Sequence, residues 1–137
     1  MNAREDLETL VGEWLTVPAV AEMLGTDVGK VRRLVQEGRL VGARVGERPV
    51  LRIPAAFLVD GRLAHGASSP SRDADAPEWA VLAAVQGTLT LLHDAQFDDE
   101  EAIAWLFTRE ESLGSTPVEA LRAGHKTQVR RLAQAEL

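Results

Sequence analysis

Apolar and polar positions near the start of the chain alternate with helical spacing in the segment 17–24. Thr16 precedes this segment, Pro18 lies in its first turn, and Gly25 follows it. Threonine accepts hydrogen bonds from free amides of a first helical turn, and proline lacks an amide hydrogen that this turn leaves unpaired. Glycine readily adopts the left-handed backbone that ends a helix. The pattern therefore predicts a short helix between Thr16 and Gly25.

A second helix is predicted from Thr26 or Asp27, as its cap, to about Glu37, with Gly38 ending it. Only two or three residues separate it from the first helix, which is the spacing of a helix-turn-helix. At 100° per residue, its apolar side chains fall on one side and are expected to pack on the first helix. These side chains are Val28, Val31, Leu34 and Val35.

The opposite side of the second helix is polar. Gly29, Arg33 and Gln36 lie there, and Lys30 and Arg32 lie on its flanks. Arginine can bind guanine and glutamine can bind adenine in the DNA major groove, while cationic side chains beside them hold phosphates. This side therefore fits a major groove. A helix surface exposed only to water has the same residue types, so this helix by itself leaves both interpretations open.

A strand, a glycine-containing turn and a second strand are predicted from Gly38 to Pro54, followed by a short closing helix. Arg44, Arg48 and Arg52 alternate with apolar residues, so we expect the three arginines to share one solvent-exposed face. The hairpin tip would then lie over the sugar-phosphate backbone or in the minor groove. A helix-turn-helix followed by such a hairpin is a winged helix.

These motifs resemble the winged helix-turn-helix of MerR-like and excisionase-like DNA-binding domains over about residues 14–60. The resemblance rests on Leu15-Thr-Val-Pro-Ala-Val-Ala21, Gly25, Gly38-Arg-Leu40, Arg44-Val-Gly46 and Arg52-Ile-Pro54. It implies DNA binding through the second helix and the wing. The long coiled-coil helix and the metal-binding cysteines of MerR-type sensors are missing from the sequence, so a metal- or drug-sensing regulator is not expected.

The segment 66–77 contains two prolines and few large apolar residues, which predicts a flexible linker or a long surface loop. Helical patterns follow from Glu78, from Asp98 with an acidic first turn, and from the capping sequence Thr116-Pro-Val-Glu119. We therefore predict a mainly α protein with a small two-stranded β-wing. Its predicted parts are a winged helix-turn-helix domain (1–65), a linker (66–77) and an all-helical interaction domain (78–137).

The second half resembles the toxin-binding domains of Xre/MbcA/ParS antitoxins. The motifs are Ala104-Trp-Leu-Phe107, Leu113-Gly114, Thr116-Pro117 and a final apolar helix. The resemblance implies a protein partner. The whole arrangement also resembles small actinobacterial DNA-binding proteins that are substrates of Ser/Thr kinases. The kinase-modified extension of that family precedes the winged helix, and the short start of this chain does not place such a site at Thr9.

The net charge of −6, from 15 Lys and Arg against 21 Asp and Glu, argues at first against nucleic acid. The charge is unevenly distributed, however. Residues 1–66 sum to zero, residues 67–137 supply the whole −6, and the segment Met23–Arg52 has seven basic and three acidic residues. Such asymmetry is typical of a polyanion-binding module joined to a part with another role. We expect the acidic half to face away from DNA.

No sequence pattern indicates catalysis, a cofactor or a metal ion. Cysteine is absent, and the three histidines lie about 30 residues apart, at His65, His93 and His125. The acidic residues of 94–101 lack the glycine of a calcium loop and fit the start of a helix instead. Neither a nucleophile motif nor a glycine-rich phosphate loop is present. The chain is therefore not expected to be an enzyme.

The apolar runs of the chain are short. The longest, Trp79–Val85, has seven residues, far from the roughly 20 that span a bilayer, and the acidic start 1–8 is unlike a secretory signal. We expect no membrane association and a cytoplasmic location, on the nucleoid when DNA is bound. Three tryptophans are expected as core anchors: Trp14, Trp79 and Trp105.

The function predicted first is sequence-specific binding of double-stranded DNA by a transcriptional regulator. The alternative is an antitoxin-like protein whose carboxy-terminal helices bind a toxin or another protein, and in a third interpretation the wing arginines serve only solubility. Winged helices of this kind often bind DNA as homodimers, so a second copy is a candidate partner. The expected DNA-binding residues are Thr26, Gly29, Lys30, Arg32, Arg33 and Gln36 at the major groove, and Arg44, Arg48 and Arg52 on phosphates.

Overall fold

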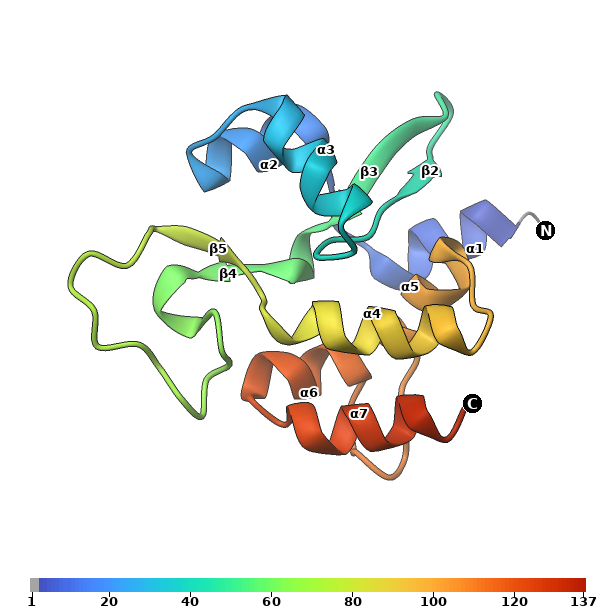
Figure 1. Ribbon diagram of the computed structural model, residues 1–137. Coiled ribbons are helices and arrows are strands. Elements are labelled where there is room, and N and C mark those ends of the chain that lie inside the picture. Colours follow the sequence, from blue (N-terminus) through green and yellow to red (C-terminus); the bar gives the residue numbers. More distant parts are fainter. Residues whose placement is uncertain (1–2) are drawn as a thin grey trace.

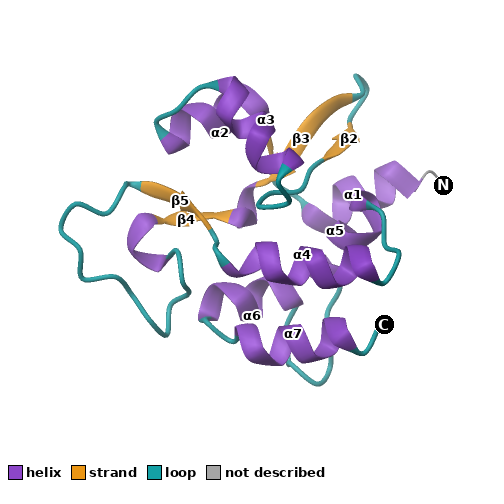
Figure 2. Cartoon of the chain, viewed as in Figure 1, coloured by secondary structure: helices purple, strands orange, loops and turns teal. Residues whose placement is uncertain are grey.

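The structure, a computed structural model, describes residues 3–137, with side chains from Asp6 onward. A winged helix-turn-helix and a group of helices lie at opposite ends of the molecule (Figure 1). The helices in the described residues are α1 (Ala3–Val11), α2 (Val17–Leu24), α3 (Val28–Gln36), α4 (Ala84–Asp94), α5 (Asp99–Phe107), α6 (Pro117–Ala123) and α7 (Lys126–Gln134). The strands are β1 (Trp14–Thr16), β2 (Ala43–Val45), β3 (Val50–Pro54), β4 (Leu58–Asp60) and β5 (Trp79–Val81). The short 3₁₀ helices are η1 (Ala55–Phe57) and η2 (Gly61–Leu63). Helices therefore dominate, and the predicted fold class is confirmed (Figure 2).

The two helices of the helix-turn-helix have the caps that the sequence predicts. The Thr16 hydroxyl oxygen accepts a hydrogen bond from the Ala19 amide (3.2 Å), and Gly25 ends α2 with a φ of 67°. Of the two candidate caps for α3, Asp27 is the one that acts, because its carboxylate accepts from the Lys30 amide (2.8 Å). These local hydrogen bonds fix both helix starts.

The predicted two-stranded wing is present as β2 and β3, and a third strand extends it into a three-stranded antiparallel sheet. β3 lies in the middle, with β2 on one side and β1 on the other. Thr16 pairs with Arg52 in this sheet and also caps α2. One residue therefore joins the sheet to the helix-turn-helix and fixes the direction in which α2 leaves it.

The helix predicted from Glu78 begins only at Ala84, which corrects the sequence prediction. Residues Trp79–Val81 form β5 and pair antiparallel with β4, twenty residues earlier in the chain. The apolar spacing at this point also fits a helix, and local periodicity contains no information about a distant strand partner. Because β5 is at the surface, Trp79 is 37% exposed and is not the expected core anchor. Trp14 and Trp105 do pack, partly buried, against the core.

The second half is otherwise helical, as predicted. α4 packs on α7, and α5 packs on α6. Asp98 and Glu101 form a reciprocal capping box at the start of α5. At the start of α6 the Thr116 hydroxyl accepts from the Glu119 amide (3.2 Å) and donates to the Glu119 carboxylate (3.0 Å). This differs from the predicted capping box, in which the carboxylate would accept from the Thr116 amide.

The two ends of the molecule share a continuous core. Phe57 is fully buried, and its ring meets the Phe107 ring edge-on with centroids 5.7 Å apart. From α6, Arg122 Nη1 donates to the Ala56 carbonyl oxygen (2.7 Å), and α1 packs against α5. The division of the chain at 66–77 stays a prediction. In the structure this segment is a long loop whose flanking strands, β4 and β5, pair with each other.

Candidate nucleic-acid interface

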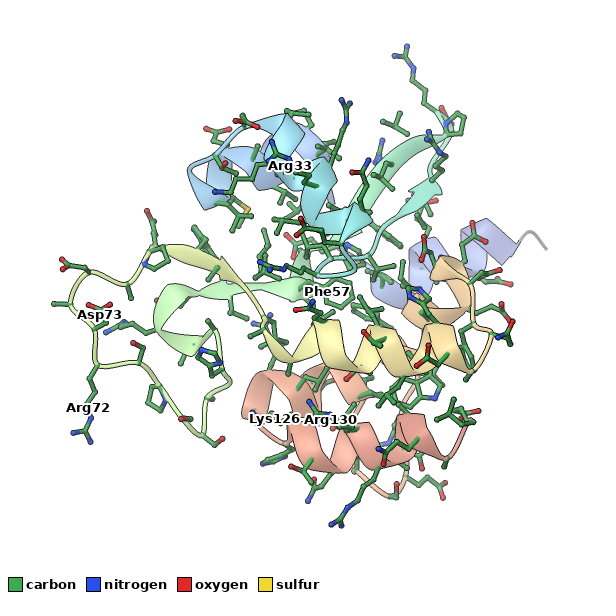
Figure 3. The ribbon with its side chains drawn as sticks, in the orientation of Figure 1. Arg33, Phe57, Arg72, Asp73, Lys126 and Arg130 are labelled. Atoms are coloured by element: carbon green, nitrogen blue, oxygen red, sulfur yellow. The ribbon has the colours of Figure 1, made fainter. Side chains whose placement is uncertain are left out.

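The polar side of α3 is exposed, as the sequence predicts. Five of its residues are exposed and Thr26, just before the helix, is half-buried; the five are Gly29, Lys30, Arg32, Arg33 and Gln36. On the other side of α3, Val31 is fully buried and the helix packs on α2. Figure 3 shows the labelled Arg33 at the winged end of the molecule, far from the helices α6 and α7. The helix thus exposes a cationic side to solvent and packs on α2 with its apolar side.

The start of α3 is built so that a large partner can approach closely. Gly29 is exposed, and a Cβ atom at this position would lie 3.3 Å from the Asp27 Oδ1 atom. Asp27 already uses this oxygen to cap the helix through the Lys30 amide. A side chain at position 29 would therefore press on the cap, and it would also stand between the helix backbone and a bound partner.

The cations of this surface form no ion pair with the carboxylates of residues 6–137. Among residues 6–137, whose side chains are described, the ion pair nearest to α3 is Arg39 Nε with Glu37 Oε2 at 3.6 Å. Lys30, Arg32 and Arg33 lie in no ion pair of that set. Phosphates could therefore bind these side chains without first displacing an acidic neighbour.

The wing arginines do not share one face of the hairpin, contrary to the expectation from their alternation. Residues directly opposite in an antiparallel pair have their side chains on the same face. Arg44 is opposite Leu51, whereas Arg52 is opposite Ala43, so the two arginines lie on opposite faces. The reason is the four-residue turn between β2 and β3, which places even-numbered residues of one strand opposite odd-numbered residues of the other.

The environments of the wing arginines differ accordingly. Arg48 is exposed in the turn, and Arg44 is exposed but donates from Nη1 to the Pro49 carbonyl oxygen (3.2 Å). Arg52 is half-buried, and its Nε atom is buried without a hydrogen-bond partner among the described residues. The Arg52 guanidinium lies over Gly46 of the turn, with its carbon 3.6 Å from the place that a Cβ on Gly46 would occupy. Gly46 has a φ of 92°, a backbone conformation that favours glycine.

Arg39 is a basic residue of this region that the motifs did not single out. Its side chain is 56% exposed, and it borders a hollow together with Leu34, Val81, Ala83 and Gln86. The charge count of Met23–Arg52 includes Arg39, but its position between α3 and the start of α4 depends on long-range packing. The sequence signal was therefore the charge alone.

Other chemistry is limited within the described part of the chain. No three side chains of His, Asp and Glu gather there as a metal-ligand set. The backbone N–H of Arg62 donates to Asp60 (2.9 Å), and this bond, with help from the Arg62 guanidinium, lowers the pKa of the Asp60 carboxyl. In residues 3–137 no helix combines the length and apolarity that crossing a membrane requires.

Two segments of the chain match models of one protein family. Residues 3–58 match the family model "DNA-binding protein Rv2175c, wHTH domain", and residues 82–136 match "Rv2175c C-terminal domain of unknown function". The protein "DNA-binding protein Rv2175c" of Mycobacterium tuberculosis (strain ATCC 25618 / H37Rv) is 34% identical over 131 residues, which cover 87% of this chain and 77% of that protein. This chain belongs to the Rv2175c family.

The structure is also similar to a solved structure of the Rv2175c family. The NMR structure of Rv2175c superposes with a TM-score of 0.66 at 32% identity, covering 90% of this chain and 80% of that one. The winged helix-turn-helix is thereby confirmed, within a family of DNA-binding proteins. The helical half matches a family domain whose function is unknown. The MerR-like, excisionase-like and antitoxin-like resemblances and the kinase connection go beyond what these matches show.

Proposed function

We propose that this protein binds double-stranded DNA in a sequence-specific manner and regulates transcription from the sites it occupies. The observation that carries the proposal is the exposed cationic side of α3, which has no acidic partner among the described side chains and lies beside a hairpin with an exposed arginine at its turn. The membership in a family of DNA-binding winged helices supports it.

In this proposal α3 lies in the major groove. Arg33 and Gln36 face base edges, because their planar groups form two hydrogen bonds to guanine and adenine, respectively. Lys30 and Arg32 on the flanks hold phosphates, and Gly29 lets the helix backbone come close. Thr26, which is half-buried just before the helix, contacts a phosphate next to the helix start in this proposal.

The wing adds contacts that carry no sequence information. Arg48 at the turn and Arg44 beside it hold phosphates or enter the minor groove. Arg52 was expected in the same role, but its half-buried position on the other face favours a mainly structural contribution through the turn at Gly46. We therefore expect Arg52 to matter less for DNA affinity than Arg48.

The remaining parts of the proposal concern partners and place. The similarity to a bacterial DNA-binding protein supports a cytoplasmic location, on the nucleoid when DNA is bound. A homodimer would place two copies of α3 on successive turns of the major groove, and the carboxy-terminal helices are candidates for that contact or for another protein partner. No feature of the described residues favours the antitoxin-like alternative over DNA binding.

The test is a binding titration of the full chain with duplexes selected from a random pool, followed by fluorescence anisotropy at several salt concentrations. Affinity decreases as salt increases, and each phosphate contact makes the slope of log affinity against log salt steeper by about 0.9. Arg33→Ala is expected to lower affinity for the selected duplex about tenfold or more and to relax the preference at one base pair. Arg48→Ala is expected to weaken binding to all duplexes equally and to reduce the slope by about 0.9.

Arg72→Ala is the matched control, because Arg72 is an exposed arginine of the 66–78 loop, away from α3 (Figure 3). It removes the same charge and is expected to leave affinity and slope unchanged. If Arg33→Ala and Arg48→Ala behave like Arg72→Ala, the assignment of this surface is wrong. If no duplex is enriched over random sequence, the sequence-specific part of the proposal fails.

A further inference from the structure

A second basic surface lies inside the acidic half of the chain. It is a hollow of about 490 Å³ between α4 and α7, and His65 of an earlier turn also lines it. Three basic side chains from two parts of the chain meet in it. The lining consists of His65, Ala83, Ala84, Gln86, Gly87, Thr90, Leu91, Lys126 and Arg130.

Within residues 6–137 no carboxylate lines this hollow, although the second half of the chain carries twice as many acidic as basic residues. Five of the twelve acidic residues of this half lie in the segment 94–101, around the start of α5. Helix α7 has three cations and no acidic residue between Lys126 and Gln134. Lys126 and Arg130 take part in no ion pair within residues 6–137. The hollow therefore presents uncompensated positive charge, which an anion would compensate.

The geometry brings the two cations of α7 together. Lys126 and Arg130 are four residues apart on α7, which places them on one face, and both are exposed (Figure 3). Gly87 of α4 makes room for the guanidinium, since a Cβ on Gly87 would lie 3.1 Å from Arg130 Nη2. The absence of a side chain at position 87 thus lets the Arg130 fork lie against α4 and face the hollow.

The start of α7 adds to the same charge. Lys126 is the first residue of this nine-residue helix, and His125 before it makes no side-chain cap. The free amides of a first helical turn carry partial positive charge. This contribution is secondary, because the converging side chains of two separate segments already define the hollow.

We propose that this hollow is a phosphate-binding site. A guanidinium fork matches two phosphate oxygens at once, and an ammonium group beside it supplies a compact positive charge. The volume lies in the range of small-ligand sites rather than of a single ion. A phosphate can reach it from two sources: a free phosphorylated compound, or the backbone of the DNA that α3 holds.

The second source is a candidate because the hollow continues towards α3. A neighbouring hollow is bordered by Leu34 and Arg39 at the end of α3 and shares Ala83 and Gln86 with the basic one. The two hollows together extend from Arg39 to Lys126 and Arg130. Only this second source depends on the proposed DNA binding, so the two are tested separately.

The first experiment uses the full chain without DNA. Pyrophosphate is titrated into ¹⁵N-labelled protein, and the amide shifts of Gly87 and of the first turn of α7 are followed by NMR. The double variant Lys126→Gln/Arg130→Gln is expected to raise the dissociation constant about tenfold or more, because it removes two charge-assisted partners. Arg131→Gln is the matched control: the same helix loses the same kind of charge, at an exposed residue that does not line the hollow.

The second experiment measures DNA affinity of the same variants over a range of salt. If the DNA backbone occupies the hollow, the double variant reduces the salt slope by up to about 1.8, whereas Arg131→Gln leaves it unchanged. If a free phosphorylated compound is the occupant, only the pyrophosphate titration responds. Arg33→Ala reports on the winged helix in parallel, so a failure of DNA binding as such is distinguishable from a failure of this site.

The proposal is overturned if the double variant equals Arg131→Gln in both experiments, that is, if the pyrophosphate affinity and the salt dependence of DNA binding are the same in the two variants. The phosphate-binding proposal is also overturned, in favour of a protein ligand, if an acidic peptide binds in the hollow and pyrophosphate does not. Because both substituted residues are exposed, the thermal unfolding midpoint is expected to stay unchanged. Should the double variant not fold, Lys126→Gln alone is compared with Arg131→Gln, and a threefold or larger loss of pyrophosphate affinity is expected.

Discussion

Phe57 offers the sharpest test of how the two ends of the molecule depend on each other. Its side chain is fully buried, and its ring contacts Phe107 of α5 edge-on at 5.7 Å between centroids. Replacing a buried phenylalanine with alanine costs about 3–5 kcal/mol, of which an aromatic pair accounts for about 0.5–1.5 kcal/mol. Because small domains have about 5–15 kcal/mol of total stability, Phe57→Ala is expected to leave the protein near the limit of folding.

The assay is urea unfolding followed by far-ultraviolet circular dichroism and by tryptophan emission. With a slope of about 2 kcal/mol per molar urea, the midpoint of Phe57→Ala falls by about 2 M relative to the native sequence. Because the core is continuous, the two signals are expected to change together in one transition. Leu10→Ala is the control, since Leu10 is 43% exposed and its loss is expected to cost under about 1 kcal/mol.

The reasoning is refuted if Phe57→Ala costs no more than Leu10→Ala. Two separate transitions, with helix content lost at a different urea concentration from tryptophan emission, would instead show that the winged helix and the helical half fold independently. That result would support the predicted division at 66–77 and contradict the coupling inferred from the Phe57 contact.

Three further predictions concern local features. Thr16→Ala removes the cap of α2 and is expected to cost about 1 kcal/mol in urea unfolding, while Thr127→Ala, at an exposed helical site, stays within about 0.5 kcal/mol. Gly66→Ala and Gly114→Ala both place a side chain at positive φ, but only at Gly66 would the new Cβ lie 2.4 Å from the backbone at the end of α6. Gly66→Ala is therefore expected to lower the free energy of unfolding by about 1–3 kcal/mol more than Gly114→Ala does. Equal losses in urea unfolding would contradict the close approach. The lowered pKa of the Asp60 carboxyl stabilises the fold at pH values above 3.8, the ordinary pKa of aspartate, and this stabilisation is lost as the pH falls through the folded pKa. The difference in unfolding free energy between the native sequence and Asp60→Asn should therefore stay constant above pH 3.8 and shrink on acidification below it.

The helix boundaries of the winged half could be predicted because their causes are local. A cap such as Thr16 bonds an amide three residues away, and a glycine such as Gly25 ends a helix by its own backbone angle. The cationic side of α3 follows from the helical period of 3.6 residues, which is equally local. The exposure of Arg33 and Gln36 was therefore predictable from the sequence.

The errors occurred where the pairing of two strands decides the outcome. Trp79 fits a helical stripe by spacing, yet its backbone pairs with a strand formed twenty residues earlier. Arg52 fits an exposed stripe by alternation, yet the length of the turn places it on the face opposite Arg44. In both cases the deciding quantity is a pairing register, which local patterns do not contain.

The sequence by itself thus determined the two helices of the helix-turn-helix, the presence of a basic hairpin after them and the concentration of acid in the second half. Only the tertiary structure decided which arginines of the wing share a face, how β4 and β5 join the two halves, and that Lys126, Arg130 and His65 line one hollow with Gly87. The physical reason is the range of the interactions. Caps, glycines and helical periodicity act within a few residues, and the turn of the wing sets the register of β2 and β3. The pairing of β4 with β5 and the hollow between α4 and α7 depend instead on segments that come together only when the core is packed.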